Sequence, residues 1–484
     1  MKLRDIIADT GVIAVSGSLD LEIAALCSDS RQVVPGALFI AVKGYASDGH
    51  AYIGQAIEKG AVAVMYEEEG AVPDGVTSIR VENSRHAVAM AADAFYGHPS
   101  RELTLVGITG TNGKTTTVTL LYRLFRDLGY SCGLLSTIAN YVGERRLETA
   151  NTTADPITIN ALLSEMVAGG CAYCFMEVSS IGVEQERVSG LHFAAGIFSN
   201  LTHDQLDYHK TFAEYLRCKK LFFDHLEETA QAIVNIDDRH GSVMVQNTAA
   251  HVVTYSCHRS ADHTARILEQ SFDGMLLKID GAETWSRLIG EHNAYNLLAI
   301  YTTAVCLGSE PSEVLVALSR LTSAPGRLEN LQGPHGVSVI IDYAHTPDAL
   351  ENVLKTLRDI APERQLTCLF GCGGDRDRTK RPEMAQVAGR LADRLVITSD
   401  NCRTEDPDAI IADIRAGLDW EGLAKSLFIT DRKEAIRTAI LTAPEGATIL
   451  LAGKGHETYQ IVGTRKYPFD EKAIVTETFK LLTK

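Results

Sequence analysis

Residues 103–128 join an apolar segment, a glycine-containing turn and an amphipathic segment. Residues 103–108 alternate well enough for a strand, and residues 117–128 place apolar side chains on one helical face before Gly129. Between them lies the run Thr-Gly-Thr-Asn-Gly-Lys-Thr-Thr, residues 109–116. Backbone N–H groups of such a turn, with the positive end of the following helix, hold phosphate oxygens. This stretch therefore predicts a strand–loop–helix cradle for a nucleoside triphosphate, within an α/β fold.

The residues of this loop are expected to bind ATP: Gly110, Thr111, Asn112, Gly113, Lys114, Thr115 and Thr116. Lys114 should reach the outer phosphates, and the Thr115 hydroxyl should reach Mg²⁺. The spacing departs from the usual one, because Ile108 stands where a glycine normally precedes Gly113 by five residues. By itself, such a loop is compatible with a kinase, an ATPase switch, a transporter motor or a ligase.

Composition narrows the class of protein. A chain of 484 residues should hold about three domains, and its 45% hydrophobic and 22% charged content is typical of globular proteins. The net charge of −16 argues against a nucleic-acid partner, which would require a basic face. No apolar run approaches the ~20 residues of a membrane span, and the N-terminus lacks the apolar core of a signal peptide. Ten cysteines without regular spacing indicate reduced thiols and a cytoplasmic location.

Breaks in the pattern predict three domains. Gly97-His98-Pro99-Ser100 is typical of a linker, and Pro325-Gly326 opens a third region. The expected domains are residues 1–98, 99–324 and 325–484. Strands alternating with helical patterns in the second and third regions predict mainly parallel sheets covered by helices.

Polar side chains follow several of the expected strands. Glu177 ends a buried strand, and Asp342 ends another, at the sheet edge where open α/β folds bind ligands. Glu177 is therefore a candidate Mg²⁺ ligand. Asn293 and Asn296 open a helix three residues apart, so their amides should share one face, although Asn293 alone is also explained as a helix cap.

A glycine-rich strand exit, residues 371–378, carries several cations and continues into Lys-Arg-Pro at 380–382. Its backbone can approach an anion closely, and Arg381 can form a fork with a carboxylate or phosphate. Lys219, by contrast, lies in an amphipathic helical pattern beside a second lysine, which is usually a solvated face. Residue chemistry alone does not select Lys219.

Taken together, these motifs resemble those of the Mur ligases, the ATP-dependent amide ligases that build the peptide of bacterial cell-wall precursors. The resemblance runs over nearly the whole chain. It rests on the loop at 110–116, Asn-Thr-Thr at 151–153, Glu-Val-Ser-Ser at 177–180, Gly-x-His-Asn-x-x-Asn at 290–296, Pro-Gly-Arg at 325–327 and Asp-Tyr-Ala-His at 342–345. The N-terminal Asp-Ser-Arg at 29–31 and the Gly-rich run at 371–377 are similar to members that add a diamino acid to UDP-N-acetylmuramoyl-L-alanyl-D-glutamate.

The resemblance implies a fold and a set of roles. The fold is a central P-loop, parallel-sheet domain between an N-terminal UDP-binding α/β domain and a C-terminal Rossmann-like α/β domain. ATP would transfer its γ-phosphoryl group to the D-glutamyl γ-carboxylate, giving an acyl phosphate that the acceptor amine attacks. Catalysis is implied for Lys114, Glu177 and Lys219, with two Mg²⁺ ions held by Thr115, Glu177, a carbamylated Lys219 and Gln205.

The resemblance also implies contacts with each substrate. We expect the protein to be a monomer. The nucleotide would also contact Asn293, Asn296, Arg327 and Asp342. The UDP-linked dipeptide would contact Ser30, His50, Asn151, Thr152, Thr153, Ser179 and Arg187. The acceptor would contact Arg381, Asp400, Asn401, Arg403, Gly453 and Glu457.

The acceptor implied is meso-diaminopimelate. Members that use it carry Asp-Asn-Pro-Arg where this chain has Asp400-Asn401-Cys402-Arg403. Diaminopimelate ends in an amine and a carboxylate, whereas lysine ends in an amine alone. Arg403 can pair bidentately with the extra carboxylate and would lose that partner with lysine bound.

The chain departs from the family at three positions: Cys402 replaces proline, Ile181 replaces a frequent histidine, and Gln205 replaces a metal-binding histidine. A Gln oxygen can bind Mg²⁺, or His203 or His209 would supply the ligand. Four readings remain open at this point: the diaminopimelate ligase, a lysine-adding or folate-polyglutamate relative, a non-catalytic paralogue that binds the precursor, and a P-loop switch or motor.

Overall fold

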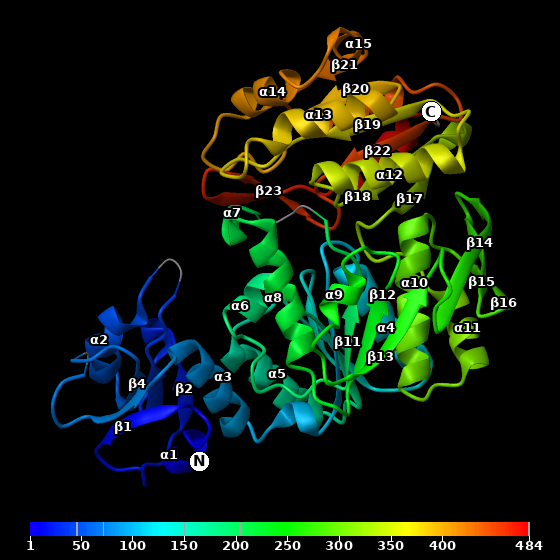
Figure 1. The fold of residues 1–484 in the computed structure, drawn as a ribbon. Helices are drawn as coiled ribbons and strands as arrows, with labels where there is room; N and C mark the ends of the chain where they lie inside the picture. The colour runs from blue at the N-terminus through cyan, green and yellow to red at the C-terminus, as the bar shows by residue number, and fades with distance from the viewer. Residues whose placement is uncertain (45–46, 71, 150, 203–205, 483–484) are drawn as a thin grey trace.

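The computed structural model describes residues 1–44, 47–70, 72–149, 151–202 and 206–482, and the chain forms three units, each built on its own sheet (Figure 1). The N-terminal unit, in blue, lies beside the green central unit, and the yellow-to-red C-terminal unit lies above the central one. The three sheets fall within the expected ranges 1–98, 99–324 and 325–484, whose boundaries remain predictions.

The N-terminal unit has a five-stranded sheet in the order β1-β5-β4-β3-β2. Its strands are parallel except for the β1–β5 pair. The elements are α1 (Leu3–Ile6), β1 (Val12–Ser16), β2 (Ala25–Cys27), β3 (Ala37–Ile40), α2 (Ile53–Glu58), β4 (Ala61–Tyr66), β5 (Thr77–Val81) and α3 (Ser84–Phe95).

The central unit has an eleven-stranded sheet in the order β16-β15-β14-β13-β12-β11-β6-β10-β7-β8-β9. Its strands are β6 (Thr104–Thr109), β7 (Cys132–Leu135), β8 (Asn140–Val142), β9 (Arg145–Leu147), β10 (Tyr173–Glu177), β11 (Ala195–Phe198), β12 (Gln231–Asn235), β13 (His251–Ser256), β14 (His263–Ser271), β15 (Gly274–Ile279) and β16 (Ala282–Ser286). Its helices are α4 (Lys114–Asp127), α5 (Pro156–Ala168), α6 (Ser180–Glu184), α7 (Leu206–His209), α8 (Phe212–Asp224), α9 (Gly241–Met244), α10 (Glu291–Cys306) and α11 (Pro311–Arg320).

The middle of this sheet is parallel from β7 to β14, as the alternating pattern predicted. Helices α4, α10 and α11 bury apolar side chains against one face, and α5 and α8 against the other. Because β6 and β10 are neighbours with Ile108 opposite Glu177, the loops that follow these two strands meet at one sheet edge.

The C-terminal unit has a six-stranded sheet in the order β17-β18-β22-β19-β20-β21, parallel except for the edge strand β17. The strands are β17 (Glu329–Gln332), β18 (Ser338–Asp342), β19 (Leu366–Phe370), β20 (Arg394–Ile397), β21 (Ser426–Phe428) and β22 (Thr448–Ala452), with a separate hairpin of β23 (Tyr459–Val462) and β24 (Arg465–Pro468). The helices are α12 (Pro347–Ile360), α13 (Lys380–Leu391), α14 (Pro407–Arg415), α15 (Trp420–Ala424), α16 (Arg432–Leu441) and α17 (Glu471–Leu482).

Two expectations about the whole chain can be compared with the fold. No helix among the described residues is both long and apolar enough to cross a membrane. All ten cysteines carry free thiols, and Cys171 and Cys174 are buried at or beside β10.

Candidate active site

The phosphate loop has the predicted strand–turn–helix geometry. It links β6 to α4, and Gly113 caps the helix with φ of +87°, a conformation that L side chains rarely adopt. A Cβ at Gly113 would lie 2.6 Å from Asn296 Oδ1, so the loop packs directly on α10. The Lys114 ammonium folds back and donates to the carbonyls of Gly110 (2.8 Å) and Thr111 (2.9 Å). These two carbonyls hold the lysine at the loop, where a triphosphate would bind.

Glu177 lies beside the loop, at the end of β10. Its carboxylate is 1% exposed and accepts hydrogen bonds from the Thr115 hydroxyl (2.9 Å) and from the Thr137 backbone N–H (2.8 Å). A hydroxyl and a carboxylate are the hard oxygen donors that Mg²⁺ prefers. The donor set at Thr115 and Glu177 therefore fits a magnesium ion.

Lys219 is buried in α8 with 1% of its surface exposed. Its ammonium donates to the Gly110 carbonyl at 2.8 Å and lies 4.7 Å from the centre of the Tyr215 ring. The sequence pattern suggested a solvated face, but the long side chain points inward to the phosphate loop. The burial of this cation against the loop is what residue patterning could not reveal.

Near Lys219 lies His209, which is also buried. Its Nε2 is 2.9 Å from the Ser180 hydroxyl, and burial, with the charge of Lys219 as a second cause, lowers its pKa below the ordinary value. A neutral imidazole can act as a metal ligand. Gln205 and His203, the other candidates for this ligand, lie outside the described residues.

Asn293 and Asn296 share one face of α10, as predicted. The Asn296 Nδ2 donates to Asn293 Oδ1 at 3.1 Å, and both side chains are buried. Capping by Asn293 is wrong as an alternative, because Gly290 holds the N-cap position and the Asn293 amide donates back to the Ile289 carbonyl. Asn296 Oδ1 also accepts from the Thr117 hydroxyl at 3.3 Å, so the pair contacts the start of α4 beside the phosphate loop.

Two carboxylates of the C-terminal unit, Asp342 and Asp348, have different partners. Asp342 ends β18, is 6% exposed, and accepts from the N–H groups of Leu328 and Ala344. Burial raises its pKa, although the Arg327 charge opposes the shift. On α12, the Asp348 carboxylate accepts from the Asn112 amide (3.2 Å) and the Thr202 hydroxyl (3.1 Å). Helix α12 therefore contacts the phosphate loop directly.

Arg327 follows the junction between the central and C-terminal units. Its guanidinium lies 4.9 Å from the centre of the Tyr343 ring, and its Nε is buried without a hydrogen-bond partner among the described residues. A buried guanidinium N–H without a partner is a ready donor for an anion. Gly326 beside it packs so tightly that an added Cβ would lie 2.1 Å from the Gly455 carbonyl carbon.

A cavity of about 700 Å³ lies between the N-terminal and central units. Among the residues that line it are Ser30, Asn151 and Arg187, all expected to contact the UDP-linked dipeptide. Burial lowers the pKa of Arg187, whose Nη1 donates to the Thr153 carbonyl at 2.6 Å. The cavity is thus lined by the N-terminal unit on one side and by Asn151 and Arg187 of the central unit on the other.

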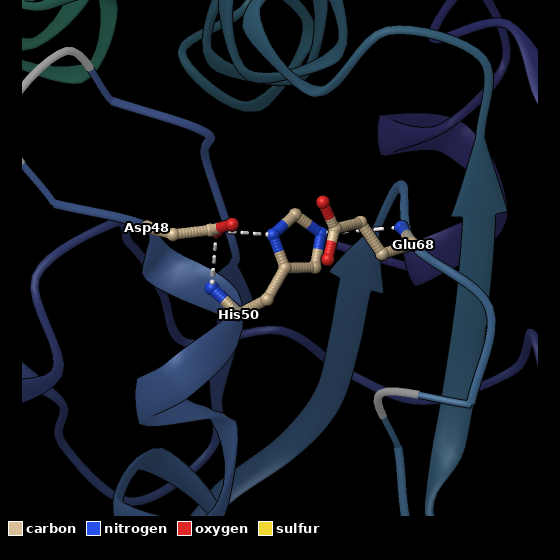
Figure 2. A group of neighbouring side chains, drawn as sticks. All are labelled: Asp48, His50 and Glu68. Carbon is tan, nitrogen blue, oxygen red and sulfur yellow. Dashed lines mark hydrogen bonds and ion pairs between the residues drawn. The ribbon is translucent and has the colours of Figure 1, made fainter.

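His50 does not line this cavity, although its neighbour Gly49 does. Its Nδ1 lies 2.6 Å from Asp48 Oδ1, and its Nε2 accepts from the backbone N–H of Glu68 at 3.3 Å (Figure 2). The same Nε2 also accepts from the Glu67 N–H at 2.9 Å. One ring nitrogen therefore pairs with a carboxylate and the other binds two backbone N–H groups, so both are occupied in this structure. The contact of His50 with the precursor stays a prediction.

Thr152, Thr153 and Ser179 lie between the cavity and Glu177. The Thr153 hydroxyl donates to the Glu177 carbonyl (2.9 Å) and accepts from the Ser179 N–H (3.0 Å), while Thr152 accepts from Thr137. The Ser179 hydroxyl caps α6. This chain of bonds ties the far end of the cavity to the candidate metal ligand.

The expected acceptor residues gather in the C-terminal unit. Asp400 and Asn401 are buried after β20, and a Cβ at Gly453 would lie 2.6 Å from Asp400 Oδ2. The Asn401 amide donates to Glu457 Oε2 at 2.8 Å. Arg403 is half-buried, has φ of +50°, and donates from Nη1 to the Gly374 carbonyl at 2.7 Å. Loops 371–378, 400–405 and 453–457 therefore form one cluster.

Arg381 has a different environment from the one expected. It is 1% exposed, and its guanidinium donates to both Glu405 oxygens (2.8 and 3.1 Å) and to Asp413 (2.8 Å). Its Nε is buried without a hydrogen-bond partner among the described residues, while the rest of the fork is occupied by these carboxylates. Arg376, which the sequence did not single out, is exposed on the same loop, and both its Cγ and Arg403 Nη1 lie within 4 Å of a Cβ built on Gly373.

Comparisons with known proteins agree with this geometry. Three family patterns match: "Mur ligase family, catalytic domain" at residues 22–96, "Mur ligase middle domain" at 108–304 and "Mur ligase, glutamate ligase domain" at 326–455. The chain is 49% identical over 486 residues to a protein of Cytophaga hutchinsonii named UDP-N-acetylmuramoyl-L-alanyl-D-glutamate--2,6-diaminopimelate ligase, covering all of both chains. The chain belongs to the Mur ligase family.

Other known proteins are also similar to this Mur ligase in sequence or in fold. A Bacteroides fragilis protein with the same name is 50% identical, over 99% of this chain and 100% of its own. A solved structure of a protein of that name aligns with a TM-score of 0.72 at 30% identity, over 100% of this chain and 99% of the other. The Thermotoga maritima MurF ligase, solved with ADP, shares the fold with a TM-score of 0.63 at 17% identity, over 96% and 98% of the two chains.

Proposed function

We propose that this Mur ligase joins meso-diaminopimelate to the D-glutamyl γ-carboxylate of UDP-N-acetylmuramoyl-L-alanyl-D-glutamate, at the expense of ATP. The observation that carries the proposal is the half-buried Arg403 guanidinium, which lies against the glycine-rich loop in the cluster that also holds Asn401 and Glu457. It presents a positive fork where the distal carboxylate of a diamino acid would bind. The relatives at 49% and 50% identity are named for this reaction.

The phosphoryl-transfer half of the reaction rests on the central unit. ATP would bind on the loop at 110–116, with Lys114 and Arg327 offsetting the charge on the transferring group. Mg²⁺ held by Thr115 and Glu177 would supply further charge neutralisation there. The product of this step is an acyl phosphate on the D-glutamyl γ-carboxylate, which the neutral amine of the acceptor attacks, releasing phosphate.

Lys219 presents an electrostatic conflict that carbamylation would remove. A buried ammonium beside the phosphate loop would repel a second Mg²⁺, whereas a carbamate would reverse the charge and add oxygen donors. We therefore propose that Lys219 is carbamylated in the active enzyme and that two Mg²⁺ ions are bound. The fit of Gln205 to the second ion stays a prediction.

In the acceptor site, Arg376 is better placed than Arg381 to meet a carboxylate. Arg381 is committed to Glu405 and Asp413, while Arg376 is exposed beside Arg403. We propose that Arg381 holds the loop and that Arg376 and Arg403 face the acceptor. We also propose that the other residues expected to contact the precursor, the nucleotide and the acceptor do so.

The cellular setting follows from less specific observations. Ten free thiols support a cytoplasmic location, and the charge of −16 supports a function without nucleic acid. The substrates would be the UDP-linked dipeptide, diaminopimelate and ATP, and the active form would be a monomer, which size-exclusion chromatography with light scattering would test.

The decisive experiment is ADP release by purified protein with the UDP-linked dipeptide and a panel of acceptors. We expect release to depend on meso-diaminopimelate and to be weak with lysine or without acceptor. Strong release with lysine and none with diaminopimelate would indicate the lysine-adding relative. Release without any acceptor would indicate a P-loop motor, and no release with any acceptor a binding paralogue.

A further inference from the structure

Lys454 is a buried cation inside the candidate acceptor site, and none of the roles considered so far uses it. It follows β22 and is 0% exposed. Its ammonium donates to the Tyr459 carbonyl at 2.8 Å and to Asn401 Oδ1 at 3.0 Å. It also lies 3.3 Å from Asp400 Oδ1 and 3.4 Å from Glu457 Oε2. Three of these four neighbours are residues expected to read the acceptor.

The bond from Lys454 fixes the direction of the Asn401 amide. Asn401 Oδ1 accepts from the Lys454 ammonium and from the Ile461 N–H at 2.9 Å, so both donors fix which way the amide points. The Nδ2 group then donates to Glu457 Oε2 at 2.8 Å. Both Asn401 and Lys454 thus engage Glu457 Oε2, and among the described residues Glu457 Oε1 has no hydrogen bond, which leaves it for a ligand.

Lys454 also sets the charge of this cluster. Two carboxylates, Asp400 and Glu457, share one ammonium, which leaves one net negative charge. Burial raises the pKa of Asp400, but the charges of Lys454 and Arg432 more than offset it, and the pKa lies below its ordinary value. Beneath them, Arg432 and Glu471 form a fully buried ion pair at 2.8 Å and cancel each other.

We propose that Lys454 is a positioning residue that shapes a subsite for the ammonium of an α-amino-acid head group. The single negative charge matches one ammonium, and the Arg403 guanidinium nearby matches one carboxylate. Without Lys454, two buried carboxylates would face each other, and one would take up a proton instead of receiving the substrate. This inference rests on the proposed function, because the head group it describes is the distal end of the diamino acid.

The test compares Lys454→Met with wild type and with Lys472→Met, a control at a lysine whose side chain is 59% exposed. We would measure KM for diaminopimelate, KM for ATP, the thermal midpoint and the pH dependence of kcat/KM for diaminopimelate. We expect KM for diaminopimelate to rise at least tenfold while KM for ATP changes less than twofold. The acid limb of the profile should move to higher pH, because Asp400 loses the cation that opposes its burial. Three other titratable groups near Asp400 and Glu457, namely Tyr343, Tyr459 and Cys372, have raised pKa values and stay neutral there. Burial lowers the pKa of the neighbouring His456 to about 4, in wild type and variant alike.

A double variant, Lys454→Met with Glu457→Gln, keeps the test decisive if the single variant folds poorly. It restores one net negative charge, so its acid limb should return toward that of wild type while KM for diaminopimelate stays high. The proposal is overturned if Lys454→Met folds with unchanged KM and unchanged pH profile, or if both KM values rise together without a shift of the acid limb. An acid limb that stays displaced in the double variant would also overturn it. If wild type itself does not use diaminopimelate, the proposed function fails instead.

Discussion

Replacing Arg403 by alanine tests how the acceptor is chosen. The guanidinium is half-buried, and its Nη1 donates to the Gly374 carbonyl at 2.7 Å. Alanine removes the fork but leaves other ties between the two loops, such as the 2.7 Å bond from Thr404 to Asp375 and the 2.9 Å bond from the Gly374 N–H to the Asn401 carbonyl. The loop should therefore keep its shape while the distal carboxylate of diaminopimelate loses its partner.

The size of the effect follows from the burial of Arg403. Removing one member of a hydrogen-bonded charge pair costs about 2–5 kcal/mol when the pair is fully desolvated. Because Arg403 is half-buried, the lower part of that range, about 2–3 kcal/mol, applies. At 1.36 kcal/mol for each factor of ten, kcat/KM for diaminopimelate should fall about 30- to 150-fold. The activity with lysine, which lacks that carboxylate, should change much less.

The assay is ADP release at varied acceptor concentration, with KM for ATP measured in parallel. Arg403→Lys should recover only part of the activity, because an ammonium keeps the charge but not the fork. Arg390→Ala is the control, since this arginine lies on α13 with a 60% exposed side chain. The reasoning is refuted if Arg403→Ala lowers the activities with diaminopimelate and lysine by the same factor, or if it leaves both unchanged.

Three other changes follow from the structure. Glu177→Gln should lower kcat at least about 100-fold and raise the Mg²⁺ concentration needed for half-maximal activity, because a ligand that neutralises charge in phosphoryl transfer is lost; an unchanged Mg²⁺ titration would contradict this. Gly326→Ala should destabilise more than Gly308→Ala, because both have positive φ but only Gly326 has backbone within 2.1 Å of the new Cβ; equal thermal midpoints would be the opposing result. Hydrogen bonds from Arg381 and from the Asp375 N–H lower the pKa of Glu405 to about 2. The ionised carboxylate therefore stabilises the fold above its unfolded pKa of 4.5, and that contribution is lost as the pH falls toward 2. The difference in free energy of unfolding between wild type and Glu405→Gln should therefore shrink between pH 4.5 and 2, and a constant difference would disprove it.

The sequence predicts best what depends on local pattern. The phosphate loop could be recognised because glycines, a lysine and a helix start are adjacent along the chain. Glu177 could be predicted for a related reason, since a carboxylate that ends a buried parallel strand must lie at the ligand-binding edge of the sheet. The shared face of Asn293 and Asn296 follows from helical spacing, and their mutual hydrogen bond bears it out.

What the sequence could not predict depends on contacts between distant segments. The pattern around Arg381 shows a cation after a glycine-rich loop, but not that Glu405 and Asp413 neutralise it. The orientation of His50 is set by the backbone N–H groups of residues 67 and 68, which come directly after β4. Lys219 looks like a surface lysine because burial of a cation leaves no mark on amphipathic spacing.

The most direct test of the account uses a UDP-linked dipeptide labelled with ¹⁸O in the D-glutamyl γ-carboxylate, incubated with ATP and meso-diaminopimelate. In the proposed reaction the carboxylate attacks ATP, and the amine of diaminopimelate then attacks the resulting acyl phosphate. This predicts one ¹⁸O atom in the released phosphate and a new amide to diaminopimelate in the product, both measured by mass spectrometry. ADP formed without the amide, or phosphate free of ¹⁸O, would contradict it.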